Sequence, residues 1–80
     1  DRALVIPLEL ARPGERHVIK QINGGAGARM RLLTMGLRIG DPIEVITNQK
    51  KGQVVIAADF KRYALGRGLA EKIMVEPVQR

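Results

Sequence analysis

The chain has 80 residues, a length that suits one domain, and we expect residues 1–80 to form a single small domain. Hydrophobic residues make up 45% of the chain but aromatic residues only 2%, which predicts a folded protein with an aliphatic core. Cysteine and serine are both absent, which excludes disulfides, thiolate metal sites and the two commonest nucleophiles. The formal net charge of +6 favours an acidic or anionic partner without saying which one.

The first part of the chain predicts an extended arm and then a strand. Apolar residues alternate at spacing two from Leu4 to Leu10, and Pro7 restricts this segment to a sheet edge or an arm. Gly14 then supplies positive φ in a turn after a proline.

A strand is expected over residues 15–22. Simple alternation places Val18 and Ile22 on one face of this strand and His17 and Ile19 on the other.

One helix is expected over residues 28–35, after a flexible, glycine-rich connector at 23–27. Its apolar stripe has spacing i, i+4 and i+7 and consists of Ala28, Leu32 and Met35.

The end of the helix has a recognisable pattern. Gly36 stands where a left-handed C′ residue is expected, and Leu37 can make the hydrophobic contact of a Schellman ending. The chain must then deliver Leu37 and Ile39 to the core before Gly40 turns it into the next strand.

The remaining segments predict short strands joined by turns, with one weak helical turn at 66–72. A hairpin loop is expected at 48–52 and a turn at 59–62. The expected barrel strands are 15–22, 43–47, 54–58, 63–65 and 73–76. Five short strands with one helix after the first indicate a small, mostly β barrel, whose closure would remove exposed sheet edges.

The sequence contains few residues suited to catalysis or to metal binding. No serine or cysteine is present, and His17 is the only histidine, so we expect no enzyme, no catalytic residue and no cofactor. The candidate metal ligands are scattered, with no metal-binding helical spacing, so we expect no metal site: they are Glu15, His17, Met35, Asp41, Glu44, Asp59, Glu71 and Glu76. The glycines at 24, 25 and 27 lack the Gly-Lys-Ser/Thr ending of a phosphate loop.

Residues 31–41 read RLLTMGLRIGD and resemble the RL-x-x-MGL-x-x-G signature of the FeoA family. Further ordered matches are the turn at 13–15, the step at 22–25, Val55, the pair at 64–65 and the closing segment at 70–75. Gln53 and Gly68 depart from the family pattern in local loop geometry only.

The resemblance implies an SH3-like barrel of about five strands. It also implies a cytoplasmic accessory of bacterial ferrous-iron uptake that binds the cytoplasmic part of the transporter FeoB, is not inserted in the membrane, and binds no nucleic acid. The expected partner-binding residues are Arg29, Arg31, Leu32, Met35, Leu37 and Arg67. The expected structural turns are Gly14, Gly36 and Gly40. Weak self-association of the chain is compatible with the sequence.

Two alternatives remain. The same barrel occurs at the C-terminus of DtxR-type metal-dependent repressors, so the chain fits a regulatory module of that kind. Basic residues also suit a small nucleic-acid-binding barrel, although only Phe60 and Tyr63 are available to stack on bases.

Overall fold

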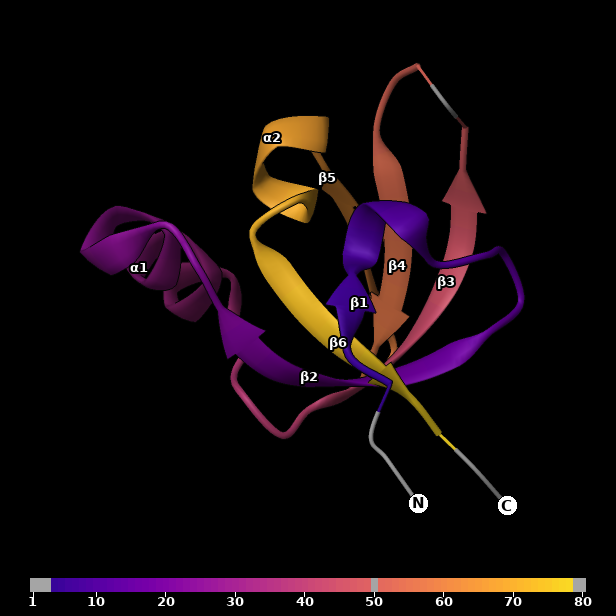
Figure 1. Cartoon of the computed structure of the whole chain (residues 1–80), viewed down its shortest axis with the longest axis horizontal. Coiled ribbons are helices and arrows are strands. Elements are labelled where there is room, and N and C mark those ends of the chain that lie inside the picture. Colours follow the sequence, from indigo (N-terminus) through magenta and orange to yellow (C-terminus); the bar gives the residue numbers. More distant parts are fainter. Residues whose placement is uncertain (1–3, 50, 79–80) are drawn as a thin grey trace.

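A computed structural model describes residues 4–49 and 51–78 (Figure 1). The elements in chain order are β1 (Ile6–Pro7), the 3-10 turn η1 (Leu8–Leu10), β2 (Arg16–Ile22), α1 (Gly25–Met35), β3 (Pro42–Asn48), β4 (Val54–Ala58), β5 (Lys61–Leu65), α2 (Arg67–Ala70) and β6 (Ile73–Pro77). The predicted mostly β class, with one helix inserted after the first barrel strand, is confirmed. No helix in the described part of the chain combines the length and apolar character needed to cross a membrane.

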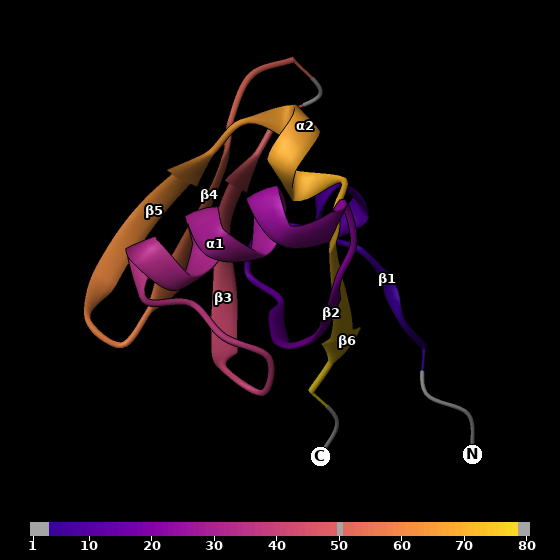
Figure 2. The ribbon, with the colours of Figure 1, turned by 90° about the vertical axis from the view of Figure 1, so that its left-hand side faces the viewer.

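The strands form one antiparallel sheet in the order β1-β6-β2-β3-β4-β5. The sheet curls around the core, and α1 lies across one side of it (Figure 2). Among the described residues, no pairing joins β5 back to β1 or β6, so the expected closure of the barrel by hydrogen bonds is wrong. The extended segment expected from Leu4 to Leu10 is a strand only at Ile6–Pro7, where β1 lies at the sheet edge as Pro7 predicted, because Leu8–Leu10 turn into η1 and bury Leu8.

The register of β2 corrects one sequence prediction. His17 and Ile19 are buried as a pair, but Ile22 is buried with them and not opposite them. The pairing of β2 with β6 shifts between Ile19 and Gln21. This β-bulge adds one residue to the strand and reverses the alternation beyond it. Alternation alone could not reveal the shift.

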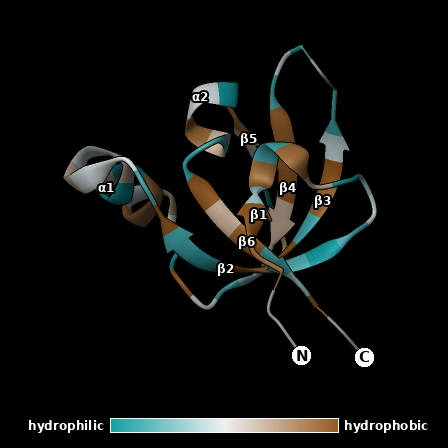
Figure 3. Cartoon of the chain, in the orientation of Figure 1, coloured by the Kyte–Doolittle hydropathy of each residue, from teal (hydrophilic) through white to brown (hydrophobic). Residues whose placement is uncertain are grey.

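The core is aliphatic, as the composition predicted. Figure 3 shows hydrophobic residues along the strands that surround the interior. The fully buried large side chains are Leu8, Ile19, Leu32, Leu37, Val45, Val54, Ile56, Leu65, Ile73 and Val75, together with His17. Histidine is thus the one buried polar residue among those described.

Two element boundaries differ from expectation. The helix begins at Gly25, three residues before the predicted start, so part of the expected connector is helical. Strand β5 begins at Lys61, because the connection from β4 needs only the two residues Asp59 and Phe60. The short helix α2 lies inside the predicted turn at 66–72.

Gly14 and Gly40 have φ values of +88° and +98°, the region that favours glycine. The N–H of Gly14 donates to Val45 (2.7 Å), and the N–H of Gly40 donates to Ile19 (2.7 Å). These bonds bring each turn close against a neighbouring strand.

Candidate partner-binding surface

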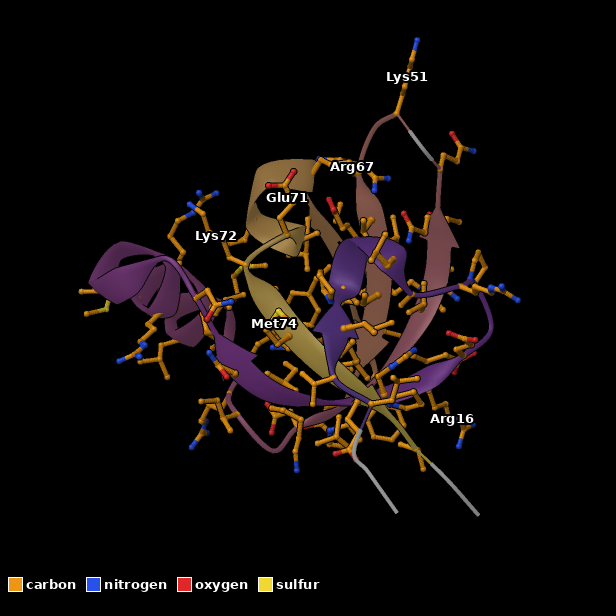
Figure 4. All side chains as sticks on the ribbon, in the orientation of Figure 1. Arg16, Lys51, Arg67, Glu71, Lys72 and Met74 are labelled. Carbon is orange, nitrogen blue, oxygen red and sulfur yellow. The ribbon has the colours of Figure 1, made fainter. Side chains whose placement is uncertain are left out.

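The helix α1 is attached to the sheet at both of its ends. At its start, the N–H of Asn23 donates to the carbonyl of Lys72 (2.7 Å). The aliphatic stem of Lys72 lies over Gly24, where an added Cβ would be 2.6 Å from Lys72 Cδ, and Figure 4 shows Lys72 beside the helix. Gly24 has φ +93°, so the backbone conformation favours glycine there, and any added side chain would also displace the flexible stem of Lys72.

The helix ends in the predicted Schellman motif. The N–H of Leu37 donates to Leu32 and the N–H of Gly36 to Leu33, each at 2.9 Å. Gly36 has φ +93°, and Leu37 is fully buried. A pocket of about 270 Å³ lies beside this corner, between Met35 and the side chain of Tyr63.

Only one face of α1 packs on the sheet. Ala28 and Leu32 are buried, and Met35 is partly buried against the core. On the opposite face, Met30 is 63% exposed and Leu33 is 54% exposed. The helix is therefore apolar on its outer side as well, which is unusual for a helix whose far face meets water.

We call the residues Ala26, Met30 and Leu33 the outer stripe of α1. Their spacing of i, i+4 and i+7 was visible in the sequence, as was the inner stripe. Sequence reasoning missed them because only one of the two apolar faces was assigned. Arg29 and Arg31 lie on the same helix, are exposed, and take part in no ion pair among the described residues.

The structure divides the six residues predicted to bind a partner. Arg29 and Arg31 are exposed and Met35 is half-buried, so they are available for contact. Leu32 and Leu37 are 0% and 1% exposed, so they cannot touch a partner without local unfolding. Their place in the prediction is corrected, because the motif that suggested them serves the core.

Arg67, the sixth residue, is engaged within the fold. Its guanidinium donates to Asn48 Oδ1 (2.9 Å) and to the carbonyls of Gly52 (3.2 Å) and Gln49. Asn48 Nδ2 in turn donates to the carbonyls of Glu9 (2.8 Å) and Ala11 (2.6 Å). Figure 4 shows Arg67 reaching from α2 toward the β3–β4 loop. Arg67 and Asn48 thus connect three segments, a role that no sequence pattern announced.

A histidine and a carboxylate of the types used in catalysis meet at the start of β2. His17 Nε2 is 3.1 Å from Glu15 Oε1, and the N–H of Arg12 donates to the same oxygen (3.0 Å). The backbone bond from Arg12, followed by the contact with His17, lowers the pKa of the Glu15 carboxyl. His17 Nδ1 is buried without a hydrogen-bond partner. Among the described residues, no three histidines or carboxylates gather as metal ligands would.

The two aromatic residues considered for base stacking have different surroundings. Phe60 projects wholly into solvent from the β4–β5 turn. Tyr63 is partly buried and packs against the core, with its hydroxyl close to Gly36. A stacking platform for single strands uses several exposed rings, and these residues do not supply one.

The comparisons with known proteins decide the family. The family model described as FeoA domain matches residues 6–77, nearly the whole chain. The chain belongs to the FeoA domain family. The resemblance predicted from residues 31–41 is thereby confirmed.

Two relatives named for iron transport or uptake cover this chain almost end to end. The protein "Putative Fe(2+) transport protein A" of Methanocaldococcus jannaschii is 47% identical over 73 residues, 91% of this chain and 88% of its own. The crystal structure of "Iron Uptake Regulatory Protein (FeoA)" is 36% identical with a TM-score of 0.88, covering 94% of this chain and 100% of its own.

The FeoA fold also occurs inside larger proteins. A manganese-dependent transcriptional repressor matches with a TM-score of 0.87 at 18% identity, covering 98% of this chain and 44% of its own. Identity at this level shows a shared fold, in agreement with the SH3-like barrel expected from the resemblance.

Proposed function

We propose that this chain is a cytoplasmic accessory of ferrous-iron transport that binds the cytoplasmic part of the transporter FeoB. It acts by contact and carries out no chemistry of its own. Membership of the FeoA family and the names of its relatives support the role in iron transport. The outer stripe of α1 supports the binding mode.

The observation that carries the proposal is the exposure of Met30 and Leu33 on a helix anchored at both ends. Folding leaves more than half of each of these two side chains in water. Covering each of them with a partner would gain roughly 1–2 kcal/mol. The stripe is held in place by the Schellman motif and by Lys72, so little ordering is needed on binding.

The charges on α1 indicate the kind of surface that the helix fits. Arg29 flanks the outer stripe, whereas Arg31 flanks the inner stripe and lines a pocket with Leu69 of α2. Arg29 and Arg31 bring two positive charges to α1, and the helix contains no acidic residue. The partner surface is therefore expected to be apolar at its centre and acidic at its rim, which speeds association and sets orientation. The proposed contact set is now Arg29, Met30, Arg31, Leu33 and the exposed part of Met35.

Calorimetric titration into the purified cytoplasmic domain of FeoB from the same organism tests this proposal. We expect saturable binding that the double variant Met30→Ser and Leu33→Ser loses while remaining folded. The matched control is Leu10→Ser, since Leu10 is 62% exposed but lies in η1. Equal binding by wild type and the folded double variant would refute the outer stripe as the contact.

A regulatory module of a DtxR-type repressor is the second candidate. The fold shared with the manganese-dependent repressor favours it. The full reading frame discriminates between the two, because a repressor would continue into DNA-binding and metal-binding regions on the N-terminal side.

A further inference from the structure

The ring of Phe60 has no role in the fold. It is the most exposed large hydrophobic side chain described, with a relative exposure of 106%. Asp59 and Phe60 form the two-residue β4–β5 turn and have φ values of +56° and +73°. Hairpin turns of this kind prefer asparagine or aspartate and then glycine, and a bulky residue at positive φ is strained. An exposed, strained phenylalanine suggests selection for something other than folding.

A second apolar side chain is presented in a similar way. Ile39 is 60% exposed, although the sequence predicted that it would join the core. It lies in the turn from Arg38 to Asp41, where the N–H of Asp41 donates to the carbonyl of Arg38 (3.1 Å) and Asp41 Oδ2 accepts from the N–H of Arg38 (2.9 Å). The bond from Gly40 to β2 holds the turn against the sheet, so Ile39 is fixed in an outward position.

These two turns are neighbours. The pocket of about 270 Å³ lies between them, with Leu37 and Asp41 from one segment and Asp59 and Lys61 from the other in its wall. Figure 2 shows the β4–β5 turn and the loop that follows α1 at the same end of the molecule, opposite α2. We call this end, defined by Arg38, Ile39, Phe60, Lys61 and Arg62, the two-turn end.

The charge of the two-turn end is positive. Arg38, Lys61 and Arg62 are exposed there, and none of them forms an ion pair among the described residues. Two carboxylates lie at the same end, Asp59 and Asp41, which accepts a hydrogen bond within its turn, so the three cations leave an excess of one positive charge. In the sequence, Arg38 precedes Ile39 and Lys61 follows Phe60, so each exposed apolar side chain has a cationic neighbour.

We propose that the two-turn end binds an anionic lipid surface, with Phe60 and Ile39 entering the interface and Arg38, Lys61 and Arg62 facing the phosphate headgroups. Two separate apolar side chains on rigid turns suit a lipid surface, because lipids can rearrange around each side chain independently. A protein partner would instead need a preformed pocket for each side chain. Cationic residues beside buried apolar ones are the usual composition of surface-bound anchors. The net charge of +6 favours the approach. This inference goes beyond the proposed function and does not depend on FeoB.

Sedimentation with lipid vesicles tests the proposal. We expect the protein to bind phosphatidylglycerol vesicles, to bind phosphatidylcholine vesicles weakly or not at all, and to lose binding as salt is added. Phe60→Gly should weaken binding on the order of tenfold, because the variant has no phenylalanine ring to transfer from water into the lipid. The same change should raise the thermal midpoint, because glycine relieves the strain of the turn. Loss of binding with increased stability separates a functional residue from a structural one.

Leu10→Ser is again the matched control and should retain vesicle binding, because Leu10 lies in η1, outside the two-turn end. The proposal is overturned if wild type fails to bind phosphatidylglycerol vesicles, or if Phe60→Gly binds them as well as wild type does. It is also overturned if Phe60→Gly loses affinity only for the cytoplasmic domain of FeoB, since the ring would then belong to a protein interface.

Discussion

The sheet and the helix α1 use their apolar residues in different ways. In β3, β4 and β6 the buried residues alternate with more exposed ones, and each large apolar side chain on the inner face is almost fully enclosed. In α1 the inner stripe is enclosed but the outer stripe is left in water. Folding explains the apolar residues on the inner face of the sheet and the inner stripe of α1, but it does not explain the outer stripe. Residues that folding leaves unexplained are the best candidates for contact with other molecules.

Adjacent leucines in α1 provide the sharpest test of this difference. Leu32→Ala should cost about 2–5 kcal/mol of unfolding free energy, because it leaves a cavity in the core. Leu33→Ala should change the unfolding free energy by no more than about 0.5 kcal/mol, because its side chain is largely exposed. Urea denaturation measures both changes. Similar losses from the two variants would mean that the helix packs differently from the structure described.

The connection between α2 and the sheet should be nearly as sensitive. Asn48→Ala removes the two hydrogen bonds that Asn48 donates to the carbonyls of Glu9 and Ala11. It also removes the oxygen that accepts from Arg67. Together these losses should lower the unfolding free energy by about 1–3 kcal/mol. Thermal or urea denaturation gives the value. Gln53→Ala is a suitable control, since Gln53 is exposed and makes no side-chain hydrogen bond among the described residues. A loss no greater than that of the control would show that the network adds nothing.

Two glycines of the α1 region should respond in opposite directions. Gly36→Ala should cost about 1 kcal/mol, since φ is positive there while an added Cβ would meet only ordinary contact with Tyr63. Gly27→Ala should stabilise the protein by up to about 1 kcal/mol, because Gly27 is helical, lacks positive φ and has open space around it. Thermal midpoints of the two variants provide the comparison. Destabilisation by Gly27→Ala would mean that this position needs glycine for an unrecognised reason.

The smallest expected effect concerns pH. Because the folded state lowers the pKa of Glu15, its contribution to stability is fully present above the ordinary carboxyl pKa of about 4.3. The contribution is lost as the pH falls through the lower pKa of the folded state. Glu15→Gln should therefore reduce the dependence of stability on pH in this acidic range, as followed by denaturation between pH 6 and 3. An unchanged pH profile would mean that Glu15 does not contribute to the pH dependence of stability.

Sequence patterns predicted the fold well where one local rule was sufficient. The end of α1 follows from a glycine between two leucine-rich segments, and β4 was placed at its observed bounds, 54–58, from its apolar residues and the flanking turns. The family resemblance supplied the rest of the fold class. Predictions were wrong where distant segments decide, as at the bulge in β2 and the open edge of β5.

The candidate site was less predictable because burial depends on tertiary contacts. Ile39 and Leu37 are both apolar residues after the helix, yet only Leu37 reaches the core. Arg67 was expected at the partner surface that the family resemblance implies, but it reaches loop carbonyls that lie 15 and 18 residues away in the sequence. The outer stripe of α1 could have been predicted, since its period matches that of the inner stripe.

The central claim is that the outer stripe of α1, and no part of the sheet, contacts the cytoplasmic domain of FeoB. Nuclear magnetic resonance of the isotopically labelled chain, titrated with the unlabelled domain, tests it residue by residue. We predict that amide signals of residues 26–35 change most and that those of 54–58 remain unchanged. Changes centred on β3 and β4 with α1 unaffected would contradict the account.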